Sequence, residues 1–181
     1  TNFEFLDSSG DLYETFHPKT NNTFSLGYRH FYKKKFSFTG GVSYVEFGAL
    51  GSDSTYTNYL DYSLSYVQIS VGGEHEVYSH KGFINVYAKA NFSVSRMVSG
   101  TQVFNNEVHS LIGHEDFGPV LISGYAGLKV SVPVNDRVDI YTLAMAGIND
   151  PAGIIRTEDL ERLRIKGANV AFGIVVDLIT E

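Results

Sequence analysis

The residues best suited to chemistry in this sequence are the histidines and acids between positions 107 and 116. They are Glu107, His109, His114, Glu115 and Asp116. Imidazole nitrogens and carboxylate oxygens bind divalent cations when several of them converge on one point. The spacing in this flexible stretch does not guarantee that they converge, so we expect a solvated polar loop without a metal or any other cofactor.

A histidine close to serines is the second combination that could carry chemistry, because an imidazole can activate a hydroxyl group as a nucleophile. His30 lies near Ser25 and Ser37 in the sequence. Structural packing explains this group more simply, and we predict no catalytic residues and no enzymatic activity. The glycine pairs Gly40-Gly41 and Gly72-Gly73 are not phosphate-binding loops, because they do not occur in a strand–glycine–helix arrangement.

Charged side chains recur at alternate positions within otherwise apolar segments. The set comprises Arg29, Glu74, Glu76, Lys89, Lys129 and Asp139. Both signs are present, so these side chains could pair if they point into one enclosed space. Pairing is required there, because an isolated charge is costly to remove from water. We therefore expect an interior charge network whose individual pairs the sequence does not specify.

The segments that carry these charges alternate apolar and polar residues with period two, which is typical of β-strands. Residues 83–95 show the pattern most clearly, with Ile84, Val86 and further apolar residues at every second position. Similar patterns occupy residues 23–32, 36–44, 66–78, 121–134, 138–147 and 169–178. The sequence therefore predicts an all-β protein with seven readable strands.

Short and long connections alternate between these strands. The short links, 33–35, 79–82 and 135–137, are polar, as hairpin turns should be. The long links are 48–65, 97–119 and 148–166, and Thr157–Arg164 within the last reads as a short helix. An even number of strands requires one more, which we expect within Asn2–Phe16, followed by a loop over His17–Asn22.

Composition narrows the class of protein. The chain has 181 residues, a formal net charge of −6 and no cysteine, so we expect one domain over residues 1–181, no disulfide and no nucleic-acid partner. No apolar run reaches the roughly 18 residues of a membrane-spanning helix. Because Thr1 is not a natural start, we expect a processed or trimmed chain.

Together these patterns predict an eight-stranded antiparallel transmembrane up-and-down β-barrel with short periplasmic turns and long external loops. In such a barrel the uncharged face of each strand contacts lipid and the charged face lines a lumen filled by side chains. A soluble lipocalin-like barrel has the opposite polarity, because its interior is apolar. A β-sandwich is compatible with the alternation, but the even strand rhythm favours the barrel.

Residues 66–78, with the sequence YVQISVGGEHEVY, resemble a strand signature of the outer-membrane β-barrel family common in Bacteroidetes. Tyr66, Gln68, Ile69 and Val71 match that signature. Phe36-Ser37-Phe38-Thr39-Gly40-Gly41 and residues 124–148 are similar to two further strands of the family. The resemblance implies a porin-like eight-stranded barrel in the outer membrane of a Gram-negative bacterium, with some relatives serving as accessory parts of secretion or assembly complexes.

The expected role is therefore structural or accessory, with outer-membrane lipid, lipopolysaccharide and envelope proteins as partners. Apolar residues in the second long link, among them Phe104, Leu111 and Ile112, could bind such a protein. Tyrosines near the presumed outer rim could form an interfacial aromatic girdle, namely Tyr44, Tyr59, Tyr62 and Tyr66. The alternatives are a lipid A-modifying hydrolase that uses His30 at the membrane rim, and a soluble lipocalin-like barrel that binds a hydrophobic ligand.

Overall fold

The computed structural model describes residues 2–6, 12–52, 59–104, 107–113, 119–151 and 162–177, whose regular structure consists of β-strands. The long strands are β4 (Thr23–Lys33), β5 (Phe36–Ser52), β6 (Tyr59–His80), β7 (Ile84–Phe104), β9 (Val120–Asn135), β10 (Val138–Pro151) and β11 (Arg162–Val176). The short strands are β1 (Asn2–Leu6), β2 (Leu12–Thr15), β3 (His17–Pro18) and β8 (Glu107–Ser110). The prediction of an all-β protein is confirmed.

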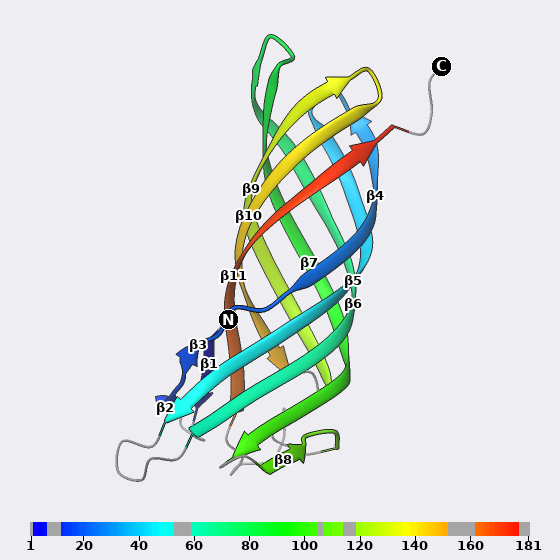
Figure 1. The fold of residues 1–181 in the computed structure, drawn as a ribbon. Helices are drawn as coiled ribbons and strands as arrows, with labels where there is room; N and C mark the ends of the chain where they lie inside the picture. Colours follow the sequence, from blue (N-terminus) through cyan, green and yellow to red (C-terminus); the bar gives the residue numbers. More distant parts are fainter. Residues whose placement is uncertain are drawn as a thin grey trace.

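All strands belong to one antiparallel sheet. Its order is β2-β1-β11-β10-β9-β7-β6-β5-β3, with β4 paired to β5 and β8 paired to β7. The long strands are tilted around a common axis (Figure 1). The links at residues 34–35, 81–83 and 136–137 lie at one end, which we call the turn end, and β1, β2, β3 and β8 lie towards the opposite end, the loop end. No apolar helix of membrane-spanning length occurs in the described part of the chain.

The strands extend further into the long links than the sequence pattern indicates. β5 and β6 pair from Phe36↔His75 as far as Ser52↔Tyr59, so much of the predicted link 48–65 is a ladder. β7 continues to Phe104 and forms a short hairpin with β8 inside the predicted link 97–119. In the third link, residues 162–164 belong to β11 and not to a helix, and the earlier residues of the predicted helix, 157–161, lie outside the described residues.

The predicted first strand is two short strands instead of one long one. β1 pairs antiparallel with the beginning of β11, from Asn2↔Lys166 to Leu6↔Arg162, and β2 folds back onto β1. The expected loop over His17–Asn22 begins with β3, which pairs with Ala49 and Leu50 of β5. The region therefore brings the N-terminal part of the chain next to β11, as an added strand must, but only at the loop end.

The sheet is strongly curled. Arg29 on β4 approaches Asp139 on β10, with 3.9 Å between Nη2 and Oδ2. Through the ladders these two strands are separated by β5, β6, β7 and β9, so only a sheet that bends round on itself can bring their side chains together. Among the described residues, no ladder joins β4 to β11.

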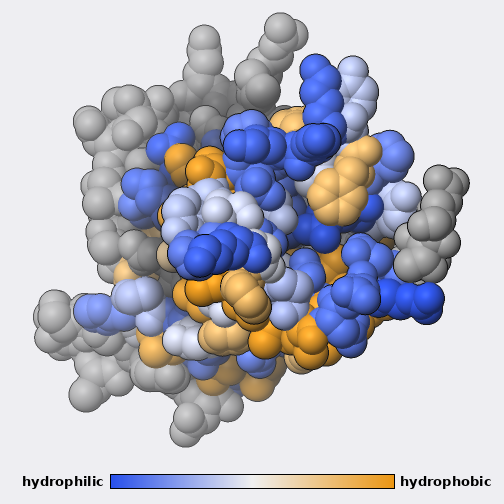
Figure 2. Space-filling view, turned by 90° about the horizontal axis from the view of Figure 1, so that it is seen from above, coloured by the Kyte–Doolittle hydropathy of each residue, from blue (hydrophilic) through white to orange (hydrophobic). Residues whose placement is uncertain are grey.

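The two faces of the sheet differ in polarity. Along β9, buried and exposed side chains alternate, with Ser131 and Lys129 on the inner face and Leu128 and Val130 on the outer face. This alternation follows from the pleat, which sends successive side chains to opposite faces. Seen from the turn end, hydrophilic residues cover much of the surface and hydrophobic residues appear along one margin (Figure 2).

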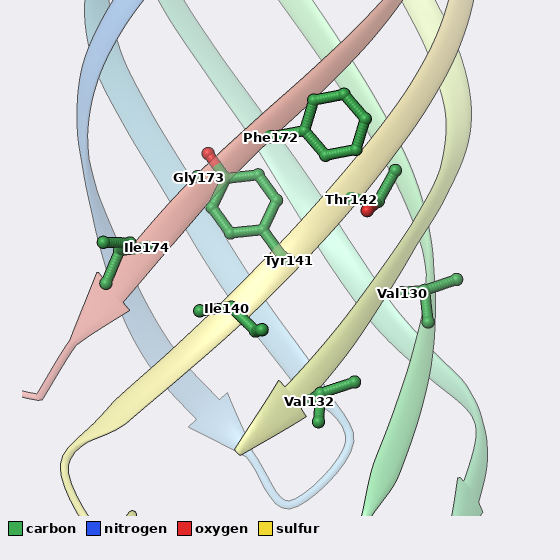
Figure 3. Close-up of a pocket in the computed structure, with 8 residues that line it drawn as sticks. All are labelled: Val130, Val132, Ile140, Tyr141, Thr142, Phe172, Gly173 and Ile174. Carbon is green, nitrogen blue, oxygen red and sulfur yellow. The ribbon is translucent and has the colours of Figure 1, made fainter. Parts of the chain in front are cut away.

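Glycines on the inner face make room for rings from neighbouring strands. Gly173 on β11 pairs with Tyr141 on β10, whose ring lies beside it (Figure 3). A Cβ at Gly173 would lie 2.4 Å from the Tyr141 hydroxyl oxygen, and a Cβ at Gly147 would lie 2.6 Å from Cδ1 of Tyr125. Glycine is therefore required where a tyrosine crosses to the next strand.

Replacing Gly127 by Ala should destabilise the protein by about 1–3 kcal/mol, as other overpacked interiors do. A Cβ there would lie 2.0 Å from the carbonyl oxygen of Ala144 and 2.7 Å from Cα of Met145. Gly124, on the same strand, has no atom within 4 Å of the added Cβ, so Gly124→Ala is the matched control and should change stability by less than about 0.5 kcal/mol. Urea unfolding followed by circular dichroism measures both. Equal stabilities would contradict the close approach of β9 and β10.

Candidate functional site

The main polar feature of the inner face is a cluster of charges around Glu74. The Glu74 side chain is only 2% exposed, and its Oε1 accepts a hydrogen bond of 2.7 Å from Lys89 Nζ. Lys129 donates to the other carboxylate oxygen, and Arg29 Nη1 lies 3.9 Å from that same oxygen. Three cations from β4, β7 and β9 therefore surround one carboxylate on β6.

Asp139 extends the cluster to β10. Its carboxylate lies 3.9 Å from Arg29 and accepts a hydrogen bond of 3.0 Å from the Ser131 hydroxyl group. Aromatic rings border the cations, since the Arg29 Cζ lies 4.5 Å from the centre of the Phe31 ring and the Lys129 Nζ lies 4.8 Å from that of Tyr87. The π-faces of these rings favour positive charge. The cluster is therefore held by ion pairs and by contacts with aromatic rings.

Five of the six residues predicted to form the interior charge network lie in this cluster: Arg29, Glu74, Lys89, Lys129 and Asp139. Glu76 is two residues from Glu74 along β6, and it pairs across the ladder with Tyr87. Within the described part of the chain, Glu76 makes no ion pair. Buried charges of both signs in contact offset the cost of removing each from water.

A layer of small polar side chains lies between this cluster and the loop end. The amide nitrogen of Gln68 donates to the hydroxyl oxygens of Ser93, at 2.8 Å, and Ser95, at 3.1 Å. Ser93, Ser95 and Ser123 are all nearly or fully buried. These side chains continue the polar inner face towards the middle of the strands.

An apolar core fills the inner face at the loop end, and the sequence analysis did not predict it. Its members are Phe3, Phe16, Val45, Phe47, Ala49, Tyr62, Leu64, Tyr66, Leu111, Leu121 and Ile165. Rings pack edge to face in it, with centroids 5.4 Å apart for Phe16 and Tyr62 and 5.6 Å apart for Phe47 and Tyr66. The alternation along β6 could have predicted this core, because Tyr62, Leu64 and Tyr66 occupy the same set of alternate positions as Glu74 and therefore the same face.

The predicted aromatic girdle is wrong for two of its four residues. Tyr62 is 8% exposed and Tyr66 is fully buried, because both lie on the inner face of the extended β6. Tyr44 is exposed on the outer face, and the side chain of Tyr59 lies outside the described residues. Exposed aromatic side chains gather instead near the turn end, at Tyr28, Tyr32, Phe38, Tyr78 and Phe83.

Of the three residues predicted to form a partner-binding loop, one is buried and two are exposed. Leu111 is 3% exposed and belongs to the apolar core, where its backbone nitrogen donates to the carbonyl oxygen of Gly100 at 2.9 Å. It is therefore not available to a partner. Phe104 and Ile112 are exposed at the loop end, beside the β7–β8 hairpin.

The histidines do not assemble a reactive site in the described part of the chain. On the β4–β5 ladder, His30 pairs with Phe38, and the next pair is Phe31 with Ser37. Because successive pairs point to opposite faces, the His30 imidazole and the buried Ser37 hydroxyl group lie on opposite faces of the sheet. Ser25 and His30 also point to opposite faces, because they are an odd number of residues apart on β4. His109 is exposed, 3.8 Å from the Glu107 carboxylate, and residues 114–116 lie outside the described ranges. No group of three potential metal ligands occurs within those ranges.

The outer face carries a depression of about 550 Å³ on β9, β10 and β11. Its lining residues are Val130, Val132, Ile140, Tyr141, Thr142, Phe172, Gly173 and Ile174 (Figure 3). None of these side chains is charged, so the depression offers mainly apolar contact. The arrangement as a whole fixes charges on the inner face and presents apolar surface on the outer face.

No family model, curated protein or solved structure matches the chain.

Proposed function

We propose that the chain is an integral outer-membrane β-barrel of a Gram-negative bacterium, filled by side chains and serving as a structural or accessory component of the envelope. The observation that carries this proposal is the polarity of the two faces. Glu74 and Lys129 are buried on the inner face, whereas Leu26 and Phe172 are 83% and 79% exposed on the outer face. A protein folded in water has the opposite arrangement.

The extent of the exposed apolar surface supports a lipid environment. Among the described residues, 32 large hydrophobic side chains are exposed and 13 hydrophobic residues are buried. They occur on every long strand, so they form a belt and not an isolated patch. Monomeric soluble proteins rarely expose apolar patches larger than roughly 300–600 Å². Contact with hydrocarbon removes this cost for the side chains of the belt, because they then no longer meet water.

The length of the belt also fits a bilayer. On β9 the outer positions from Ile122 to Val134 carry no charge. The 12 residue steps between them rise about 3.3 Å each, and at a tilt of about 45° they span roughly 28 Å. The apolar band of membrane barrels is about 25 Å tall. The tyrosines and phenylalanines exposed near the turn end lie where an interfacial aromatic girdle would be.

The filled interior favours a structural role over transport. The charge cluster, the serine-rich layer and the apolar core occupy the inner face in succession from the turn end to the loop end. No reactive constellation accompanies them in the described residues. The exposed Phe104 and Ile112 at the loop end are suited to contact an envelope protein.

Fractionation of cells that produce the protein tests the proposal. We expect the protein in the outer-membrane fraction, extractable only with detergent, with a mobility on a gel that changes when the sample is heated. Native purification in mild detergent would then identify co-purifying envelope proteins. A monomer that stays folded in buffer without detergent would overturn the membrane assignment.

Ion conductance tests the filled interior separately. In a planar lipid bilayer the reconstituted protein should give no stable conductance steps. We expect the apolar core to close this path, because the rings of Phe3 on β1 and Tyr62 on β6, two strands that share no ladder in the described residues, have centroids 6.2 Å apart. A 16-stranded porin measured in the same bilayer is the positive control. Reproducible steps from the purified protein would contradict a side-chain-filled interior.

A further inference from the structure

The two outermost long strands of the sheet, β4 and β11, each have an edge without a ladder in the described residues. In the described part of the chain, β4 pairs only with β5. β11 pairs with β10 along most of its length, but its other edge is paired only from Arg162 to Lys166, by β1. From Gly167 to Val176 that edge has no ladder partner within the described ranges. Unpaired strand edges expose rows of backbone donors and acceptors.

The surroundings of these two edges are unusually exposed. On β4 the inner-face positions Ser25 and Gly27 are exposed, whereas Ser93 and Ser131, on central strands, are 3% and 0% exposed. On β11 the inner-face residue Asn169 is exposed as well. Two of the most exposed apolar side chains of the outer face, Leu26 and Phe172, also belong to these strands. Among the residues that the structure describes, the side chains on both faces beside the seam between β4 and β11 therefore lack a neighbouring strand.

The direction of the strands defines what can fill the seam. Six antiparallel ladders connect β4 to β11, through β5, β6, β7, β9 and β10, so β4 and β11 run in the same direction. Their arrows in Figure 1 both point towards the turn end. One strand running the opposite way can make antiparallel ladders with both of them. β1 already runs in that direction and already pairs with β11.

We propose that the seam is the site of one further antiparallel strand that continues β1 beyond Asn2, supplied by residues on the N-terminal side of Asn2 in the same polypeptide. Continued in the register of β1, which pairs Asn2 with Lys166, such a strand would lie opposite Gly167 and the residues that follow it. A strand of roughly ten residues matches the unpaired length of β11 and the usual span of a membrane strand. Its outward residues are apolar and its inward residues small or polar, as on its two neighbours.

A second copy of the chain does not fit this seam. Copies inserted in one membrane share an orientation, so their β4 and β11 edges run in the same direction and would pair only in parallel. This exclusion rests on the proposed membrane location, whereas the requirement for an antiparallel strand rests on the ladders alone. In lipid the unpaired edges would be costly, because the hydrocarbon offers no hydrogen-bond partners to their backbone groups.

Photo-crosslinking tests the proposal. It is carried out in cells that produce the natural polypeptide, including any residues before Asn2. A benzophenone amino acid replaces Leu26 in one variant and Phe172 in another, both exposed positions, and mass spectrometry identifies the crosslinked peptide. We expect both variants to capture the same segment, from the N-terminal side of Asn2. Val94, which lies between Ile69 and Ile122 in two ladders, is the matched control and should capture only β6 and β9.

Crosslinks from Leu26 directly to β11, crosslinks to a different polypeptide, or capture of lipid alone at both positions would overturn the proposal. Removing the residues before Asn2 should reduce the specific product to the level of the unirradiated sample. Fractionation on the same samples separates this result from the membrane assignment. A soluble protein that still captures its own N-terminal segment would refute the membrane location and keep the added strand.

Discussion

Replacing Glu74 by Gln should lower the free energy of unfolding by about 3–5 kcal/mol, the usual cost of breaking a buried ion pair from one side. The substitution keeps the shape of the side chain and removes its charge. Lys129, which is 4% exposed at its side chain, and Lys89 then lose their common carboxylate. Equilibrium unfolding in urea, followed by circular dichroism in a fixed detergent or lipid, measures the change.

Glu76 provides the matched control for this substitution. It lies on the same strand two residues away, but it makes no ion pair within the described part of the chain. Glu76→Gln should change stability by less than about 0.5 kcal/mol. Adding Lys129→Met to Glu74→Gln should recover part of the loss, because it removes one of the unpaired charges. Equal effects at Glu74 and Glu76 would show that the cluster does not contribute as described.

Arginine at Leu128 should destabilise the protein by about 2–4 kcal/mol if the outer face meets lipid, and arginine at Val134 by about 0–1 kcal/mol. Both residues lie on the outer face of β9 and are similarly exposed, at 54% and 60%. Leu128 is at the middle of the uncharged outer row of β9, and Val134 is at its turn end. The free-energy cost of a charge in a membrane depends on its depth. The expected difference between the two arginine variants therefore comes from the different depths of residues 128 and 134.

The same pair of substitutions separates lipid from water. On a surface in water, both arginines should change stability by less than about 0.5 kcal/mol, because neither disturbs a buried contact. Unfolding from lipid vesicles in urea measures both variants against the parent protein. A flat profile along β9 would therefore refute the lipid-facing assignment even if the protein were recovered with membranes.

Hydrophobic periodicity predicted the strands well and their ends poorly. The turns at the turn end were located to within about two residues, because polar residues interrupt the alternation there. At the loop end the strands continue through residues that the pattern assigned to links, such as 48–52 and 59–65. Both faces of those segments are rich in apolar residues or small polar ones, so the contrast between faces that reveals a strand is weak.

For the candidate site, the face on which the charged residues lie could be predicted, but their contacts could not. Arg29, Glu74 and Lys129 could be assigned to one face, because a charge among apolar neighbours fixes the parity of its strand. The contacts among them could not be predicted, since Arg29 reaches Glu74 and Asp139 only through the curvature of the sheet. Tyr62 was misplaced because it fell within the predicted link 48–65. Tyr66 began the predicted strand 66–78 and shares the parity of Glu74, but it was assigned to the rim because it adjoins that link.

The ladder between β1 and β11 joins the first described residues of the chain to nearly the last, with Asn2 opposite Lys166. β1 precedes all the other described strands in the sequence, and its partner β11 is the last of them. Closing so large a loop is entropically costly, and contacts this distant in sequence form slowly. Hairpins such as β6–β7 join strands that are neighbours in the sequence, but the loop end is completed only when β1 has paired with β11.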